Sequence, residues 1–227
     1  MTKRSFCAFL FLFASTLVTF ADDYMPLRAG ATSEYSVNLT GKFSHEPTRG
    51  TFIQKVLPSQ NLNNQILIPV QNGGGYLDFY AETKDGIIHW GHQSASDIQP
   101  IQDEALKIIL PSSHKLGTSW KYNYNTSLLT KNFLLEVDMT VVAVNETLTL
   151  PAGVFEHCIM IKYKGKKAVP SSSTFALQGK SVVTVEGYDW YAPGVGLIHS
   201  IADETGVGYS SHKEQGEIVM LLTKFSK

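Results

Sequence analysis

Hydrophobic and polar residues alternate along much of the chain with a period of two. In YSVNLTGKF, residues 35–43, Tyr35 and Val37 begin an apolar series whose intervening positions are polar. In LEVDMTVVAV, residues 135–144, Leu135 begins a second such series. Because successive side chains of a strand point to opposite faces of a sheet, this pattern predicts strands with one buried and one solvated face. Such strands are typical of antiparallel sheets.

Turn-forming residues separate these stretches at short intervals. Asp85-Gly86 lies between YLDFYAET and IIHWGH and predicts a β-hairpin with a type I′ turn, since both residue types tolerate positive φ. In DWYAPGVGLIHSI, Pro193 presets φ for the second position of a turn and Gly194 supplies the positive φ that a type II turn needs next. The residues that we assign to structural turns are Pro151, Gly153, Pro193, Gly194 and Gly196.

Helical patterns are scarce. The one candidate is PIQDEALKIIL, residues 100–110, with a proline at its start and acidic residues in its first turn. This segment is either a short helix or an edge segment of the sheet. The many short strands predict an all-β protein built as an antiparallel open barrel or a strongly curved sheet, with at most one or two short helices.

Two segments of the chain resemble each other. MPLRAGATSEYSVN begins at Met25 and LPSSHKLGTSWKYNYN begins at Leu110, and both run from a basic residue through a glycine into an aromatic strand. The matching pairs are Arg28 with Lys115, Gly30 with Gly117, and Tyr35 with Tyr122. This similarity predicts a single all-β domain over residues 22–227 that contains two similar β-halves, residues 22–108 and 109–227.

The first 21 residues have the pattern of a secretory signal peptide. Lys3 and Arg4 precede the apolar run from Phe6 to Phe20, and small residues precede the expected cleavage site after Ala21. An uncleaved membrane anchor is the alternative, but the apolar run is short for a span. We therefore expect a protein exported to the periplasm or the extracellular space, with no stable membrane span after cleavage.

The expected mature chain has one cysteine, Cys158, because Cys7 lies in the signal segment. An internal disulfide is therefore not expected, and Cys158 reads as a small buried residue. No run of like charge occurs, which argues against a nucleic-acid partner. Three Asn-x-Ser/Thr sequons begin at Asn38, Asn125 and Asn145, and nothing else in the sequence assigns them a role.

Residues with catalytic or metal-binding chemistry are scattered. His89 and His92 are three positions apart, so on a strand they should point to opposite faces and not share a metal ion. Asp189 lies between Tyr188 and Trp190, where it either is solvated on the outer face or orients a neighbouring group, and the outer face is its simplest location. We therefore predict no catalytic residue, no metal site and no cofactor.

Aromatic residues are abundant, and some of them are candidates for the wall of an interior cavity. Open barrels of this size either fill their interior with side chains or leave room for a ligand. The candidate cavity residues are Trp90, Trp120, Tyr122, Trp190 and Tyr191. Alternation along the strand places Trp190 and Tyr191 on opposite faces, so both cannot line one pocket.

Four segments, LRAGATSEY, LGTSWKYNYN, LPAGVFEHCIMIKY and WYAPGVGLIHSI, resemble a set of uncharacterised bacterial exported proteins and lipoproteins. The resemblance covers the chain from about Met25 to Ile201, and its main motifs are PAGxFxxC and YAPGVG. It implies an all-β exported protein without known catalytic residues. A remoter likeness of architecture alone is to the open-barrel periplasmic lipoprotein carriers, and it transfers no residues.

Three functional hypotheses follow. The first is a non-enzymatic exported protein that acts as a binding or interaction module, with an unknown protein or a hydrophobic small molecule as its partner. The second is a carrier of lipid or another hydrophobic ligand inside a half-open barrel. The third is an enzyme of unrecognised type that uses Asp189, His199 or Cys158, which requires these side chains to share a cleft.

Overall fold

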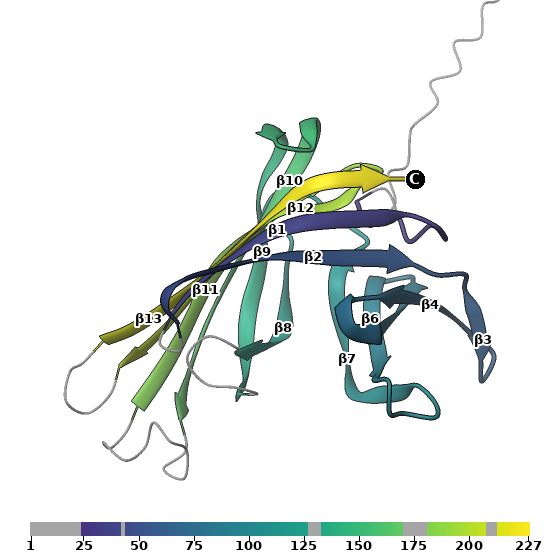
Figure 1. Ribbon diagram of the computed structural model, residues 1–227, viewed down its shortest axis with the longest axis horizontal. Helices are drawn as coiled ribbons and strands as arrows, with labels where there is room; N and C mark the ends of the chain where they lie inside the picture. Colours follow the sequence, from purple (N-terminus) through teal and green to yellow (C-terminus); the bar gives the residue numbers. More distant parts are fainter. Residues whose placement is uncertain (1–23, 42–43, 127–132, 170–180, 208–212) are drawn as a thin grey trace, which may run out of the picture.

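The computed structural model describes residues 24–41, 44–126, 133–169, 181–207 and 213–227, so the expected signal segment lies outside the described residues. The described chain is almost entirely β-structure in one sheet of 13 antiparallel strands (Figure 1). The strands are β1 (Thr32–Gly41), β2 (Ser44–Val56), β3 (Gln60–Leu62), β4 (Gln65–Gln71), β5 (Leu77–Thr83), β6 (Gly86–Gln93), β7 (Ile101–Pro111), β8 (Ser119–Thr126), β9 (Phe133–Leu150), β10 (Gly153–Val169), β11 (Ser181–Ala192), β12 (Gly196–Val207) and β13 (Lys213–Ser226). The prediction of an all-β, strongly curved antiparallel sheet is confirmed.

The helix considered for residues 100–110 is wrong, and its edge-segment alternative is confirmed. Residues Ile101–Pro111 form β7, which lies at one edge of the sheet and pairs with β6. Leu110 is fully buried, so the strand gains both ladder hydrogen bonds and apolar burial. The helical cues were local, and this tertiary gain outweighs them. Within the described residues the only helical element is the short 3-10 turn Gly73–Gly75.

The sheet consists of two consecutive six-stranded meanders. Its order is β7-β6-β5-β4-β2-β1 in the first meander, followed by β13-β12-β11-β10-β9-β8 in the second, with β3 paired to β4 outside this path. β1 joins β13 over the register from Thr32↔Ser226 to Thr40↔Glu217. Because β7 extends to Pro111, the two meanders divide after that residue rather than at residue 108.

Each meander begins with the same turn. Gly30 has φ 94° and donates its backbone N–H to Val56, and Gly117 has φ 84° and donates to Val141. The next residues repeat the pattern, because Ala31 and Thr118 donate to Arg28 and Lys115. Ala31 and Thr118 in turn accept from Val56 and Val141. The sequence similarity around Gly30 and Gly117 therefore corresponds to one repeated local structure.

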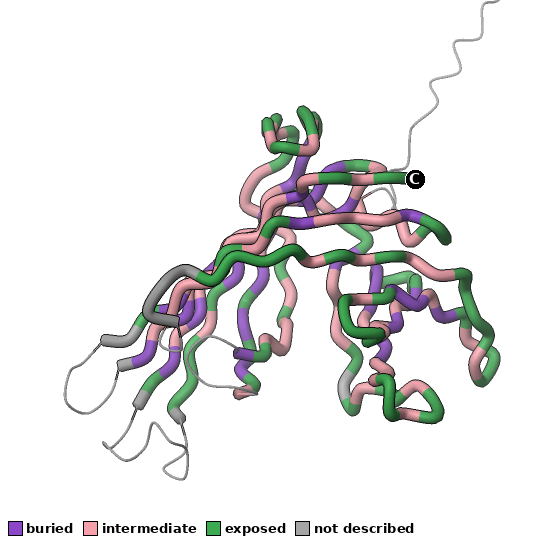
Figure 2. The backbone as a smooth tube through the Cα atoms, in the orientation of Figure 1, coloured by how far each residue is buried: buried purple, intermediate pink, exposed green. Residues whose placement is uncertain are grey.

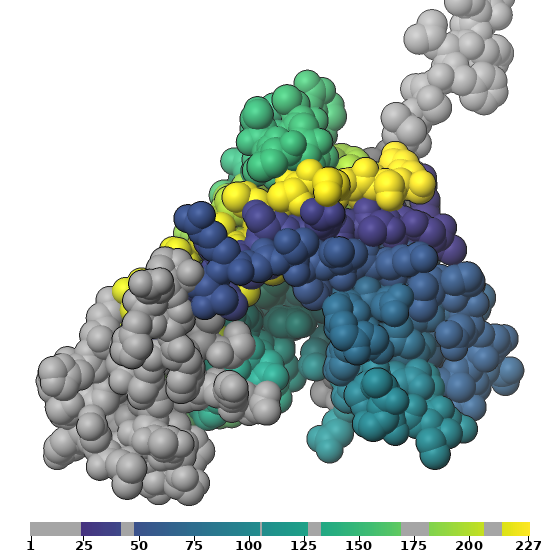
Figure 3. All heavy atoms as spheres, in the orientation of Figure 1, coloured from purple at the N-terminus to yellow at the C-terminus, as the bar shows by residue number. Residues whose placement is uncertain are grey.

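The two edge strands, β7 and β8, approach each other without forming a ladder. The indole N–H of Trp120 on β8 donates to the carbonyl of Ile108 on β7 at 3.1 Å. In the described residues this side-chain bond joins β7 to β8, whereas a ladder of backbone hydrogen bonds joins β1 to β13. The sheet is thus an open barrel with a seam between β7 and β8, and in Figure 3 its lower side is hollowed between the lobe of β4–β7 and the teal strands of the second meander.

Buried side chains gather in three apolar clusters, and Figure 2 shows buried positions along the strands of both meanders. The largest cluster lines β9, β10 and β11, with Val137, Ile161 and Val185 as fully buried members. A second surrounds Tyr35 and Cys158, and a third contains Phe79 and Trp90 in the first meander. The core therefore follows the curved sheet instead of filling a closed barrel.

The turns differ in one respect from the sequence prediction. The β5–β6 hairpin exists, but Thr83 pairs with Gly86, so Lys84 and Asp85 are its central residues. Asp85 does not have positive φ, whereas Gly86 has φ 132°, so the turn is not type I′. Instead, the chain turns at Lys84-Asp85 and Gly86 begins the returning strand.

The segment Ala192–Gly196 connects β11 to β12 by a tight turn. The Val195 N–H donates to the Ala192 carbonyl at 3.2 Å, and Gly194, after Pro193, has φ 70°, the geometry of a type II turn. At the β9–β10 connection, Pro151-Ala152 form the turn and Gly153, with φ 137°, pairs with Leu150.

Candidate functional site

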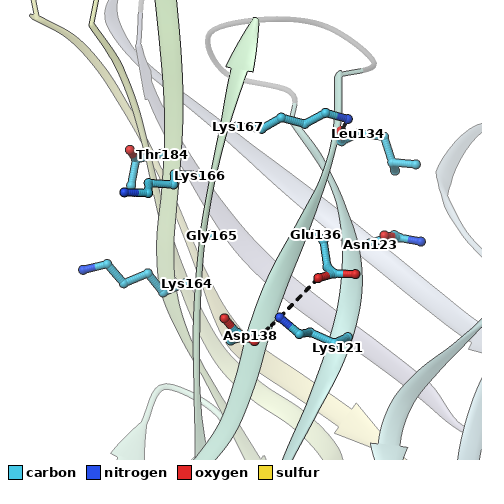
Figure 4. Close-up of a pocket in the computed structure, with 10 residues that line it drawn as sticks. All are labelled: Lys121, Asn123, Leu134, Glu136, Asp138, Lys164, Gly165, Lys166, Lys167 and Thr184. Atoms are coloured by element: carbon cyan, nitrogen blue, oxygen red, sulfur yellow. Dashed lines mark hydrogen bonds and ion pairs between the residues drawn. The ribbon is translucent and has the colours of Figure 1, made fainter.

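A large hollow of the described molecule lies on the outer face of the sheet. It measures about 690 Å³ and is bordered by β8, β9, β10 and β11 (Figure 4). Its lining residues include Lys121, Glu136 and Asp138, and Lys121 forms ion pairs with both carboxylates. All three side chains are 60% exposed or more, so these charges are solvated and neutralise one another. This groove therefore resembles an ordinary charged surface.

A smaller cavity of about 350 Å³ lies on the concave face. It is enclosed by β7 and by all the strands of the second meander, so both sides of the seam contribute to it. Its walls are mainly apolar and aromatic, with few polar side chains. The lining residues are Ile109, Tyr122, Tyr124, Asn125, Met139, Tyr163, Asp189, Tyr191, Leu197, Ser200, Ala202, Ile218 and Met220. This combination is typical of small-molecule sites, which measure roughly 300–1,000 Å³.

A second interior hollow of about 150 Å³ adjoins this cavity. The two share Ile109, Tyr191 and Leu197 as wall residues. Residues 25–27, before β1, line the second hollow and extend across this end of the barrel. Tyr24 holds the segment by donating its hydroxyl to the carbonyl of His157 at 2.9 Å. The interior is thus bounded at one end by the N-terminal segment.

Asp189 is the one carboxylate in the wall of the 350 Å³ cavity, and its expected location on the outer face is wrong. It accepts a hydrogen bond from the Ser200 hydroxyl at 2.6 Å. In the part of the chain that the structure describes, no lysine, arginine or histidine forms an ion pair with it. Burial raises its pKa to about 6, and the Ser200 hydrogen bond offsets only part of this shift. Asp189 is therefore a sheltered acid without a cationic partner.

Four tyrosines form much of the wall around Asp189. Burial raises the pKa of the Tyr122 hydroxyl to about 12 and those of Tyr163 and Tyr191 well above the usual value. The nearby Asp189 charge adds to the shift in all three. Tyr124 stacks on Tyr163 with ring centroids 5.9 Å apart. The Tyr124 hydroxyl donates to Glu204 and the Tyr163 hydroxyl to the Ile201 carbonyl, so the wall near the carboxylate is aromatic and its hydroxyls are neutral.

The first meander has an interior acid of its own, Asp78, but with a cationic partner. His89 lies between two carboxylates, with Nε2 3.0 Å from Asp78 and Nδ1 2.9 Å from Asp103. Lys107 also contacts Asp103 at 2.8 Å. Burial alone would lower the pKa of His89, but the hydrogen bonds to Asp78 and Asp103 outweigh it and raise this pKa. A carboxylate at each ring nitrogen favours the protonated imidazolium, which pairs with Asp78.

The prediction that His89 and His92 point apart is wrong. His92 Nδ1 lies 3.6 Å from Asp103, the same carboxylate that His89 contacts. The reason is a bulge in the β6–β7 ladder, where His89 pairs with Lys107 but Gly91 pairs with Gln102. Such irregularities break the two-residue period. Among residues 24–41, 44–126, 133–169, 181–207 and 213–227, no three His, Cys, Asp or Glu side chains are placed to hold a metal ion.

The five residues predicted for a cavity wall separate into two groups. Tyr122 and Tyr191 line the 350 Å³ cavity. Trp120 closes the seam through Ile108, and Trp90 packs edge-to-face on Phe79 in the third cluster. Trp190 stacks on His199 at 4.6 Å and donates its indole N–H to Glu146 at 3.0 Å, away from Asp189. Alternation along β11 thus separates Trp190 from Tyr191.

The three residues suggested for an unrecognised enzyme do not share a cleft. Asp189 lines the interior cavity, whereas His199 pairs with Trp190 and stacks on its ring. Cys158 has 0% exposure, its thiol contacts the Phe155 carbonyl, and burial raises its pKa. A buried thiol whose pKa is raised is a poor nucleophile. The geometry offers no nucleophile–base–acid arrangement among these residues.

The sequence reasoning missed both the His89 cluster and the interior position of Asp189. A signal for them exists, because LDFYA followed by GIIH in residues 77–89 resembles YDWYA followed by GLIH in residues 188–199. The two segments form equivalent hairpins, β5–β6 and β11–β12, of the two meanders. Asp78 and Asp189 occupy matching positions, so the repeat places these two acids at equivalent points of the two halves.

Comparison of the chain with protein-family models, with curated proteins and with solved structures finds no match. In the part of the chain that the structure describes, no helix has the length and apolar character needed to cross a membrane.

Proposed function

We propose that this chain is a non-enzymatic binding protein that holds a small, largely apolar molecule on the concave face of its open barrel. The observation that carries the proposal is the 350 Å³ cavity, whose walls are apolar and aromatic apart from a few polar side chains. Rigid strands supply every wall residue, so the cavity needs little rearrangement before binding. The proposal joins the first two hypotheses from the sequence, a binding module and a carrier of a hydrophobic ligand.

The seam supports this function because it provides a route to the interior. β7 and β8 both line the cavity. In the described chain they are joined by the hydrogen bond from the Trp120 indole N–H to the Ile108 carbonyl. Opening the seam would break one side-chain bond instead of a ladder of backbone bonds. Export to the periplasm or the extracellular space remains part of the proposal and depends on the N-terminal 21 residues.

The first experiment is native mass spectrometry of the protein purified from its own host, followed by titration with the neutral apolar dye N-phenylnaphthylamine. We expect a retained small molecule or saturable dye binding. Ile218→Trp places a large ring in the cavity wall and should weaken dye binding at least tenfold. Leu134→Trp adds the same ring to the outer groove and serves as the matched control. Ligand-free protein that does not bind the dye would refute the proposal, as would equal effects of the two substitutions.

A further inference from the structure

The cavity contains an acid that the protein itself leaves without a counter-ion. In the first meander the carboxylate of Asp78 is neutralised by His89 at 3.0 Å. In the second meander the matching Asp189 meets only the neutral hydroxyl of Ser200 among the described residues. An ionised carboxylate in a sheltered site is costly unless a cation pairs with it. The difference between the two halves points to a cation that arrives with the ligand.

The surroundings of Asp189 match the chemistry of an ammonium group. Tyr122 on β8, Tyr163 on β10 and Tyr191 on β11 line the same cavity, and aromatic faces attract cations, most strongly where water is excluded. Tyr163 lies against Gly187, where an added Cβ would come within 2.2 Å of the ring, so the absence of a side chain at Gly187 leaves room for this ring. Carboxylate and aromatic faces together are complementary to an alkylammonium ion.

The remaining wall residues favour an apolar body on the same molecule. Met139, Leu197 and Ile218 present aliphatic surface to the cavity. A further carboxylate, Glu204, is fully buried on β12 and accepts a hydrogen bond from Tyr124 at 3.4 Å. The Asp189 carboxylate disfavours an anionic head group, because like charges would meet in a sheltered site. A free fatty acid is therefore a poor match.

We propose that the cavity binds a molecule with a protonated or quaternary ammonium head on a short apolar body, with Asp189 as its counter-ion and Tyr122, Tyr163 and Tyr191 around the head group. This inference rests on the proposed function, because it specifies the ligand of the same cavity. It assigns Asp189 the role of a specificity-determining residue that is kept at a cost in stability.

The test compares ligands with one chain length and different head groups on the full chain at pH 8. In displacement of N-phenylnaphthylamine, octylamine and octyltrimethylammonium should show dissociation constants at least tenfold lower than that of octanol. Octanoate should bind most weakly. Asp189→Asn should remove the tenfold preference for the ammonium ligands and leave octanol binding unchanged. Asp138→Asn, at an exposed acid of the outer groove, should change neither.

The pH profile tests the same residue independently. Octyltrimethylammonium keeps its charge at every pH, so a change in its affinity reports the protein. Ser200 and the three tyrosines face Asp189, and the raised tyrosine pKa values remove them from titration between pH 4 and 8. Affinity should fall about tenfold as the pH drops through about 6, the pKa of Asp189, and Asp189→Asn should abolish this fall.

The outcomes separate the two proposals. If no octyl compound and no dye binds, the proposed function fails and the ligand class fails with it. If octanol binds as tightly as octylamine, or if Asp189→Asn keeps the preference for ammonium, the ligand class is wrong while the binding function stands. Circular dichroism of Asp189→Asn establishes that the variant is folded.

Discussion

The hairpins β5–β6 and β11–β12 are two versions of one structure with different interior chemistry. Both carry Asp-aromatic-Tyr-Ala on the outgoing strand and Gly-apolar-Ile-His on the returning strand. In the first, the histidine pairs with Tyr80 and bonds Asp78. In the second, the histidine pairs with Trp190, and Ser200 pairs with Asp189 and bonds it. Two similar sequences thus place a histidine–carboxylate pair in one half and, within the described part of the chain, an acid without a cation in the other.

The position of a β-bulge explains this difference. In β12 the bulge precedes the histidine, because Tyr191 pairs with Leu197 and Trp190 with His199, whereas in β6 the ladder is unbroken from Gly86 to His89 and the bulge follows it. Directly paired residues of an antiparallel ladder share a face, and a shift of one residue moves a side chain to the other face. His199 therefore stacks on Trp190 instead of entering the interior. The position of one bulge decides whether the interior acid receives a histidine from the chain itself.

The largest expected effect is on the free energy of unfolding, and it differs between glycine substitutions in the two turns. Gly86 and Gly196 both begin the returning strand with positive φ, 132° and 104°. A Cβ at Gly86 would lie 2.1 Å from the Leu110 carbonyl oxygen, whereas at Gly196 the nearest atom is Pro26 Cδ at 3.9 Å. Gly86→Ala should lower the free energy of unfolding by about 4 kcal/mol and Gly196→Ala by about 1 kcal/mol, the cost of backbone strain alone. Urea denaturation measures both, and equal losses would contradict the close approach of β7.

The next effect concerns the two histidines. His89→Leu leaves Asp78 facing Asp103 without the imidazolium between them, which should cost about 3 kcal/mol of unfolding free energy. His199→Leu removes only the stacking on Trp190 and should cost about 1 kcal/mol. Denaturant titration at pH 6 compares them. If the His199 variant is the less stable of the two, the assignment of the charged pair to the first meander is wrong.

The two acids should respond to neutralisation with opposite signs. Asp189→Asn removes a sheltered charge and should raise the unfolding free energy at pH 8 by about 2 kcal/mol. Asp78→Asn removes a partner of His89 and should lower it by about 1–2 kcal/mol. Because the folded pKa of Asp189, about 6, exceeds the ordinary value of 3.8, its contribution to stability is present below pH 3.8 and lost as the pH rises through about 6. At pH 3.5, Asp189→Asn should therefore leave the free energy of unfolding unchanged.

The contribution of His89 to stability also falls as the pH rises, but at a higher pH than that of Asp189. Its pKa is raised in the folded state, so its contribution is complete below the ordinary value of 6.5 and is lost as the pH rises through the folded-state pKa. Thermal unfolding of the wild type and both asparagine variants between pH 3.5 and pH 9 tests these signs together. Parallel curves for the three proteins would contradict the difference between the halves.

The smallest effect lies at the seam. Trp120→Phe removes the hydrogen bond to Ile108 but keeps an aromatic ring, and should cost about 1 kcal/mol. Amide hydrogen exchange should increase along β8 and β7 more than along β1 and β13, which a full ladder joins. Uniform exchange across both junctions would show that the seam is not the weaker one.

Alternation in the sequence was sufficient to predict the sheet, since it depends on the local geometry of strands such as residues 135–144. The bends at Gly30 and Gly117 were also indicated by the sequence, because their positive φ angles favour glycine. The helix expected at residues 100–110 was wrong because its cues ignored the ladder to β6 and the burial of Leu110. The contact of both His89 and His92 with Asp103 was not predictable, because a bulge changes the face of the sheet to which one of them points.

By itself, the sequence determined the all-β class, the positions of most turns and the opposite facing of Trp190 and Tyr191, because these depend on a period of two and on the φ angles that proline and glycine allow. Only the tertiary structure decided that Asp189 faces an apolar cavity while Asp78 faces a histidine. That outcome depends on register, bulges and the curvature that brings β7 and β8 together. These are long-range properties, and the position of a single bulge is enough to reverse them.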